Sequence, residues 1–292
     1  MQRIERFAPW MLRGAWIVVV LLAIPAIDAA CEDRPEAIHD VARIVGALLW
    51  VSGVAAMAVP AVATLTATRL LVPLAIPASL VTAFGGAGTA VAVAFVVAAL
   101  AATFVAASAP LGRAFVQASA YGDEDRHLLR PPQAYLAAAL VTWLVWAGAV
   151  LAAPLLLADR RWVVGGVTGA VAVAGAAWGW RRWHRLSRRW FVLVPTGVVV
   201  HDHVVLGETL MIRRNELAAL HLAPAGTEAL DLTGPAAGHA VEVVTREPTT
   251  VILAATPKAR RGHVLHFPGC LVAPTRPGQL LRAARERRLP VG

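Results

Sequence analysis

The stretch WGWRRWHRLSRRW, from Trp178 to Trp190, decides how this chain is organised. It holds five arginines, one histidine and four tryptophans, and Leu186 is its only aliphatic residue. Tryptophan favours the membrane–water interface because its ring is apolar and its N–H needs a polar partner, while arginine reaches outward to headgroups. The pattern predicts that a membrane domain of residues 1–184 ends here and that a water-exposed domain of residues 185–292 begins.

The basic and aromatic side chains of this junction are the site residues that the sequence indicates. We expect them to lie at the membrane interface. They are Trp178, Trp180, Arg181, Arg182, Trp183, Arg185, Arg188, Arg189 and Trp190.

Composition agrees with a membrane protein. Hydrophobic residues make up 58% of the chain and charged residues only 15%, with a mean hydropathy of +0.63. Soluble domains usually carry about a quarter charged residues. Residues 181–292 hold sixteen Lys and Arg against eight Asp and Glu, whereas the first 180 residues hold eleven against ten. A basic domain beside a bilayer is most simply held by anionic headgroups. A nucleic-acid partner fits the sign of the charge, but no recognition motif supports one.

Six segments have the hydropathy of membrane helices. A helix needs about 20 apolar residues to cross the hydrocarbon core. The stretch from Leu70 to Pro110 is too long for one crossing, and Gly85 and Gly86 divide it. The first piece contains Pro73 and Pro77, so we expect a kinked or re-entrant segment. The predicted spans are Trp10–Ile27, Ile44–Val62, Leu70–Phe84, Thr89–Ala109, Gln133–Leu157 and Trp162–Trp180.

The arginines predict the orientation. With six spans and the N-terminus inside, twelve arginines fall in cytoplasmic segments and four (Arg34, Arg43, Arg160, Arg161) fall outside. We therefore expect a multi-pass protein of the bacterial plasma membrane with both termini cytoplasmic. The start of the chain resembles a signal peptide, but no convincing cleavage site follows, which favours a retained first helix.

Small residues recur along the last predicted span. Gly165, Gly169, Gly175 and Gly179 lie at helical spacing. Such a row forms either a dimerisation face, and hence a homo-oligomer, or an intramolecular helix contact, and the second is the commoner arrangement. Five of the six predicted spans contain no Asp, Glu, Lys, Arg or His, which disfavours an ion-coupled transporter.

After Trp190 the sequence changes to short apolar runs separated by turn residues. Pro195-Thr196-Gly197 predicts a hairpin in which glycine supplies a positive φ. A helix with Thr275 as its N-cap follows the strands and reaches about Arg288. The predicted strands are Trp190–Val194, Val198–Asp202, Thr209–Arg213, Leu217–Leu222, Ala229–Leu232, Ala240–Arg246, Thr249–Ala255 and His263–Ala273.

Two passages resemble a known family. RRWFVLVPTGVVVHDHVVL (Arg188–Leu206) and VAPTRPGQLLRAARERRLP (Val272–Pro290) are similar to bacterial, mostly actinobacterial, multi-pass membrane proteins that carry a C-terminal pleckstrin-homology-like (PH-like) domain. The resemblance implies a β-rich barrel closed by a C-terminal helix and a location in the membrane. It implies no settled activity. Phosphoinositide-binding PH domains place basic residues around the first hairpin turn. The turn here, Val194–Val198, has none, so inositol phosphate recognition is not supported.

Chemical motifs are weak. Asp123, Glu124 and Asp125 beside His127 could gather a divalent cation, but a docking loop for the C-terminal domain or a partner is the better interpretation. His201 and His203 could share a face and bind a metal with His263 or His266, although Asp202-His203 reads equally as a turn. We interpret Arg213-Arg214 and Arg260-Arg261 as headgroup-facing or solvated. Cys31 and Cys270 cannot form a disulfide framework.

The sequence thus predicts about six transmembrane helices followed by a cytoplasmic PH-like barrel, with no catalytic site, no cofactor and no metal. The favoured function is a membrane-anchored scaffold or regulator that engages anionic lipid, a protein partner of unknown identity, or both. The runner-up is a transporter or lipid-handling protein regulated by that domain, because interrupted helices often line substrate sites. A metal-assisted enzyme is a third hypothesis.

Overall fold

The chain forms two compact units, each made of two stretches of sequence. The structure is a computed structural model that describes residues 2–254 and 263–292. The helical unit comprises Met1–Phe115 and Ala139–Trp183, and the sheet unit comprises Val116–Ala138 and His184–Gly292. Residues 116–138, which the hydropathy pattern leaves within the membrane half, therefore fold with the C-terminal residues.

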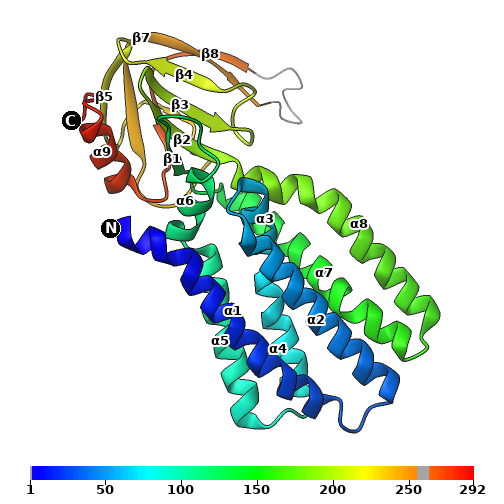
Figure 1. The fold of residues 1–292 in the computed structure, drawn as a ribbon. Coiled ribbons are helices and arrows are strands. Elements are labelled where there is room, and N and C mark those ends of the chain that lie inside the picture. The colour runs from blue at the N-terminus through cyan, green and yellow to red at the C-terminus, as the bar shows by residue number, and fades with distance from the viewer. Residues whose placement is uncertain (1, 255–262) are drawn as a thin grey trace. The chain divides into compact units, whose positions relative to one another are not determined.

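Between Gln2 and Ser187, which the structure describes throughout, the chain forms nine helical segments, with strand β1 between α6 and α7 (Figure 1). Among the described residues, six stretches are long and apolar enough to cross a membrane: Glu5–Ala30, Glu36–Ala58, Val62–Phe84, Thr89–Ala107, Gln133–Ala158 and Trp162–Ser187. A multi-pass membrane protein is thereby supported. The segments are α1 (Gln2–Ala30), α2 (Glu36–Ala58), α3 (Val62–Leu71), η1 (Val72–Leu74), α4 (Ala75–Phe84), α5 (Thr89–Ala107), α6 (Ala109–Gln117), α7 (Gln133–Ala158) and α8 (Trp162–Ser187).

The third span differs from the short, re-entrant segment expected at Leu70–Phe84. It begins eight residues earlier, at Val62, and runs through α3, η1 and α4 to Phe84. Pro73 lacks an N–H and so interrupts the helical hydrogen bonds at η1. The Trp143 Nε1–H of α7 donates to the Leu70 carbonyl at this break, at 3.0 Å. A neighbouring helix thus satisfies a backbone group that the proline turn leaves open.

Tryptophans and glycines fit together at the helix contacts. Trp16 of α1 donates its Nε1–H to the Trp50 carbonyl of α2 at 3.1 Å, and a Cβ on Gly53 would lie 2.6 Å from the Trp16 ring. In α8, Cβ atoms on Gly165 and Gly175 would meet Leu157 and Trp146 of α7 at 2.7 and 3.0 Å. These two small residues therefore serve intramolecular packing.

In the part of the sheet unit that the structure describes, the strands form two four-stranded sheets with the orders β1-β2-β3-β4 and β5-β7-β8-β6. Isolated bridges, Leu129 to Pro274 and Leu206 to Leu253, join them, but the sheets do not close into the predicted barrel. The C-terminal helix α9 begins at Pro277. The bounds are β1 (Asp125–Leu128), β2 (Arg189–Val194), β3 (Gly197–Asp202), β4 (Leu210–Arg213), β5 (Leu217–Leu222), β6 (Leu230–Asp231), β7 (Val241–Leu253), β8 (His263–Val272) and α9 (Pro277–Glu286).

Most of the predicted strands are present, with two changes. The two strands expected on either side of Glu247-Pro248 are one long strand, β7, whose pairing with β8 shifts between Val244 and Thr249. The predicted loop before Pro131 contains a strand, β1, that pairs antiparallel with β2. The hairpin after β2 is as expected: Gly197 has φ +153°, and a Cβ there would lie 2.2 Å from the Ile212 carbonyl oxygen.

One apolar core lies inside the sheet unit. Both sheets and α9 contribute fully buried side chains, so the helix is part of the core and not an appendage. The most buried members include Phe191, Leu193, Ile212, Leu220, Val243, Cys270 and Leu280.

Pairing of β1 with β2 also constrains the membrane topology. Strands of one sheet must lie on one side of a bilayer, because an open sheet edge is not tolerated within hydrocarbon. Residues 125–128 and the C-terminal strands therefore share a side, and α7 and α8 cross as a hairpin between them. This conclusion is independent of where the arginines lie.

Candidate functional site

The junction places five of its nine predicted interface residues on the surface. Helix α8 continues through the arginines to Ser187, and β2 starts at Arg189. The Arg182 guanidinium lies over the Trp178 ring, 3.6 Å from its centroid. Cation–π stacking of this kind holds the guanidinium beside the aromatic ring without neutralising the positive charge. The exposed residues are Trp178, Trp180, Arg181, Arg182 and Arg185.

The other predicted interface residues lie elsewhere. Trp183 is buried, donates its Nε1–H to the Ala139 carbonyl at 3.2 Å and packs against Trp146. Arg189 and Trp190 are buried in the sheet unit, and Arg188 is half-buried. The side chains of Trp183, Arg189 and Trp190 therefore face protein and not solvent.

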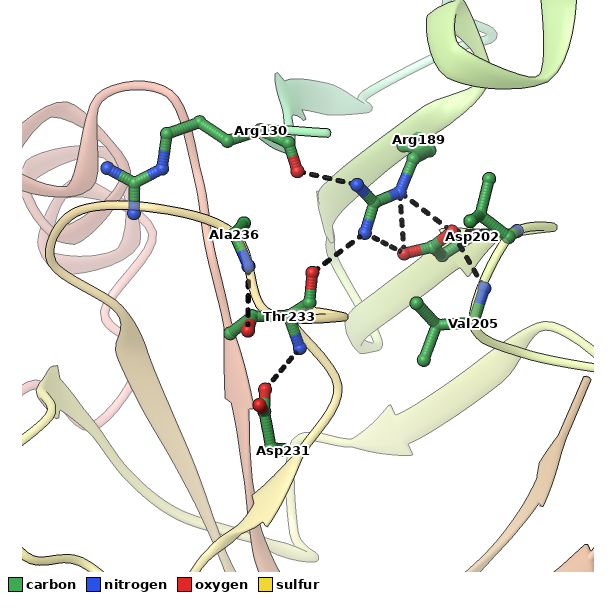
Figure 2. A network of polar contacts seen from close by, with 8 residues as sticks. Arg130, Arg189, Asp202, Val205, Asp231, Thr233 and Ala236 are labelled. Carbon is green, nitrogen blue, oxygen red and sulfur yellow. Dashed lines mark hydrogen bonds and ion pairs between the residues drawn. The ribbon is translucent and has the colours of Figure 1, made fainter. Parts of the chain in front are cut away.

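Arg189 sits at the centre of a buried polar network (Figure 2). It is 0% exposed and Asp202 is 2% exposed. Its Nε donates to both Asp202 carboxylate oxygens at 2.9 Å, and its Nη2 donates to Oδ2 at 2.6 Å. The Asp202 Oδ1 also accepts from the Val204 and Val205 backbone N–H groups. Both charges are thus paired and hydrogen-bonded, as buried charges must be.

The same guanidinium reaches two further segments. Its Nη1 donates to the Arg130 carbonyl at 2.5 Å, and its Nη2 donates to the Thr233 carbonyl at 3.2 Å. Arg130 follows β1, and Thr233 follows β6. One side chain therefore joins β2, the end of β3, the loop before α7 and the loop after β6, as Figure 2 shows.

Backbone contacts reinforce this attachment of residues 116–138. The Leu129 N–H donates to the Arg189 carbonyl, and the Arg130 N–H donates to the Ala273 carbonyl at 2.7 Å. Asp123 accepts from Arg287 beyond α9, with Oδ1 2.6 Å from Nη2. The expectation that this loop docks on the C-terminal domain is confirmed by these contacts.

Two histidines and a tryptophan cluster where β2 begins and β3 ends. The His201 ring stacks on Trp190, with centroids 4.7 Å apart, and His203 meets His201 edge-on at 4.4 Å. The His201 Nδ1 lies 3.2 Å from Thr209 Oγ1. Burial, followed by the charges of His203 and Arg188, lowers the pKa of His201 to about 4, and burial also lowers the pKa of His203.

This lowered pKa predicts acid sensitivity. Unfolded His201 binds a proton near pH 6.5, whereas the folded side chain resists it until about pH 4. The unfolded state therefore gains protons first, so stability is full above pH 6.5 and falls as the pH drops towards 4. His201→Gln is expected to flatten the loss of thermal stability of the detergent-solubilised chain between pH 6.5 and 4.5. The control His239→Gln, at an exposed position, should lose as much thermal stability over this pH range as the unaltered chain does. Titration of His201 near pH 6.5 by NMR would contradict the prediction.

His201 and His203 lie side by side, but no third proposed metal ligand among the described residues joins them. Across residues 2–254 and 263–292 there is no group of three or more His, Cys, Asp or Glu that could hold a metal ion. Asp202 is committed to Arg189, and His266 faces Thr250 instead of His201. In the acidic loop, Glu124 pairs with Arg126 at 2.8 Å and Asp123 pairs with Arg287.

A basic hollow lies beside the first hairpin turn. Its volume is about 640 Å³, and it is lined by Pro195, Thr196, Met211, Arg213, Arg214 and Asn215. Arg214 donates from Nη2 to the Arg287 and Arg288 carbonyls at 3.1 and 2.6 Å, which fixes a cation at the C-terminal end of α9. Turn residues 195–197 carry no base, yet the last residue of β4, Arg213, and the first residue of the following turn, Arg214, are both basic. Arg260 and Arg261 lie outside the described residues.

The chain was compared with protein families, curated proteins and solved structures. No family model, no curated protein and no solved structure matches it.

Proposed function

We propose that this protein is a membrane-anchored scaffold or regulator whose basic junction and sheet unit engage anionic lipid headgroups. The observation that carries the proposal is the band of exposed Trp178, Trp180, Arg181, Arg182 and Arg185 on the last candidate span. Basic residues at a bilayer surface are attracted to anionic lipid by about 1 kcal/mol each. The hollow lined by Arg213 and Arg214 adds a second cationic surface for headgroups or for an acidic protein partner.

Within this proposal the sheet unit is a divergent PH-like domain on the cytoplasmic side of a bacterial plasma membrane, and the protein is not an enzyme. Two sheets around one core with a C-terminal helix support the domain assignment. Six crossings return the chain to the side of its N-terminus, and the excess of arginines on that side supports a cytoplasmic location.

Lipid retention tests the proposal. The chain is purified in detergent, and native mass spectrometry measures its binding of phosphatidylglycerol against phosphatidylcholine. Replacing Arg181, Arg182 and Arg185 together with glutamine should weaken phosphatidylglycerol binding by about 3 kcal/mol, roughly 100-fold, because three surface charges are lost.

The matched control changes Arg160 and Arg161 to glutamine at the other end of α8, next to Trp162. This variant should retain phosphatidylglycerol at nearly the level of the unaltered chain. The proposal that the junction selects anionic headgroups would be contradicted if the unaltered chain bound the two lipids equally. It would also be contradicted if both variants lost the same amount of phosphatidylglycerol binding.

A further inference from the structure

Strands β7 and β8 continue together beyond the rest of their sheet. After the shift in pairing at Val244, residues 249–253 pair with residues 263–267, from Thr249 with Phe267 to Leu253 with His263. We call these paired segments the β7–β8 ribbon. Figure 1 shows β7 and β8 extending side by side along this part of the sheet. The ribbon joins the core through Val251 and Phe267, which are both buried.

The outer part of the ribbon exposes apolar side chains on both faces. Val264 is 61% exposed and Leu265 is 36% exposed. Neighbouring residues of a strand point to opposite faces, so neither face of the ribbon is covered at this point. The four residues from His263 to His266 are all exposed, whereas β8 is mostly buried from Phe267 onwards.

The sequence next to this apolar end carries charge of one sign. Residues 254–266 read AATPKARRGHVLH, with Lys258, Arg260 and Arg261 and no Asp or Glu. Exposed apolar residues flanked by bases favour the boundary between headgroups and acyl chains, where apolar contact and attraction to anionic lipid act together.

A bilayer is already tethered to this domain. The chain passes between the helical unit and the sheet unit three times, after Phe115, after Ala138 and after Trp183, so three covalent links hold the domain beside the membrane. Tethering raises the effective concentration of the bilayer around the domain, so that even a weak contact between them becomes well populated. A soluble protein partner would have no such advantage.

We propose that Val264 and Leu265, at the end of the β7–β8 ribbon, insert into the interfacial layer of the bilayer that the chain spans. The inference rests on the proposed function, since it gives the lipid-engaging domain a third contact with the membrane. The contact adds apolar insertion to the headgroup attraction supplied by the junction arginines.

Depth-dependent quenching tests the insertion in the full chain. Val264→Cys is labelled with an environment-sensitive nitrobenzoxadiazole dye, and the chain is placed in nanodiscs that contain phosphatidylglycerol and lipids with a nitroxide on the acyl chain. We expect blue-shifted emission and strong quenching. Cys31 and Cys270 are both buried, and the unaltered chain gives the labelling background.

Two further positions make the result specific. Leu222→Cys, 53% exposed on β5, is the matched control and should stay unquenched. Thr250→Cys, exposed on the same ribbon but further from its end, should be quenched less than Val264→Cys. Water-like, unquenched emission at Val264 overturns the proposal, and so does protection of that dye that appears only when another protein is added.

The outcome can be separated from that of the lipid-retention experiment. Quenching reports apolar insertion, whereas mass spectrometry reports headgroup selection. Quenching at Val264 in a chain that binds both lipids equally would support the ribbon contact and reject headgroup selection at the junction.

Discussion

Replacing Arg189 with methionine is expected to destabilise the sheet unit by about 3–5 kcal/mol, because it leaves the Asp202 carboxylate buried without its counter-charge. The change also removes the donors to the Arg130 and Thr233 carbonyls. Native-state hydrogen exchange of the full chain, followed by mass spectrometry of β2 and β3 peptides, measures the loss as faster exchange of their amides.

The neighbouring residue provides the control. Arg188 is half-buried and adjoins Arg189, so Arg188→Met removes the same charge from the same strand end and should cost under about 1 kcal/mol. Adding Asp202→Leu to Arg189→Met should restore part of the protection, since no unpaired buried charge then remains. If β2 amides exchange at the same rate with and without Arg189, the network is not what holds these segments.

A fragment of residues 184–292 alone is expected not to fold stably. It lacks β1 and therefore loses Leu128 and Leu129, which are 3% and 4% exposed. Burying two leucines contributes about 3–6 kcal/mol, a large part of the stability of a small domain. Circular dichroism during heating and the dispersion of amide proton shifts would show the absence of a cooperative fold.

Supplying the missing strand should rescue that fragment. Residues 116–132, joined to residues 184–292 by a flexible glycine-serine linker, restore the β1–β2 pairing and should melt cooperatively. The same linked fragment with Leu129→Asp should behave like residues 184–292 alone. A cooperative transition in the unlinked fragment at the temperature of the linked one would show that β1 is dispensable.

Much of the fold can be predicted from local patterns in the sequence. The hydropathy of the spans and the change of period after Trp190 place the helices and most strands close to where the structure has them. Residues 125–128, Asp-Arg-His-Leu, escape this reasoning because three of the four are ionisable and no apolar alternation is visible. They are a strand because they pair with β2, some 60 residues later, and a non-local pairing leaves no mark on the local pattern.

The buried role of Arg189 is hidden in a different way. Among five arginines of one junction it looks like the other four, yet it begins the strand that carries Phe191 and Leu193 on the same face. The two-residue turn Pro195-Thr196 sets the hairpin register, which places Arg189 opposite Asp202. Counting outward from that turn would have found the pair. The hollow beside Arg213 and Arg214 depends on how two turns approach each other, and no spacing in the sequence reports that.

Assembly of the sheet unit from two stretches of chain imposes an order on biosynthesis. Strand β1 leaves the ribosome before α7 and α8, and its partner β2 follows about 60 residues later, which takes roughly 3–12 s at 5–20 residues per second. During that delay Leu128 and Leu129 have no sheet to join, and the insertion machinery must deliver both helices before β2 can pair. The sheet unit can therefore fold completely only after the α7–α8 hairpin has entered the membrane correctly. In a chain whose hairpin fails to insert, β1 stays unpaired and is accessible to the quality-control proteases of the cell.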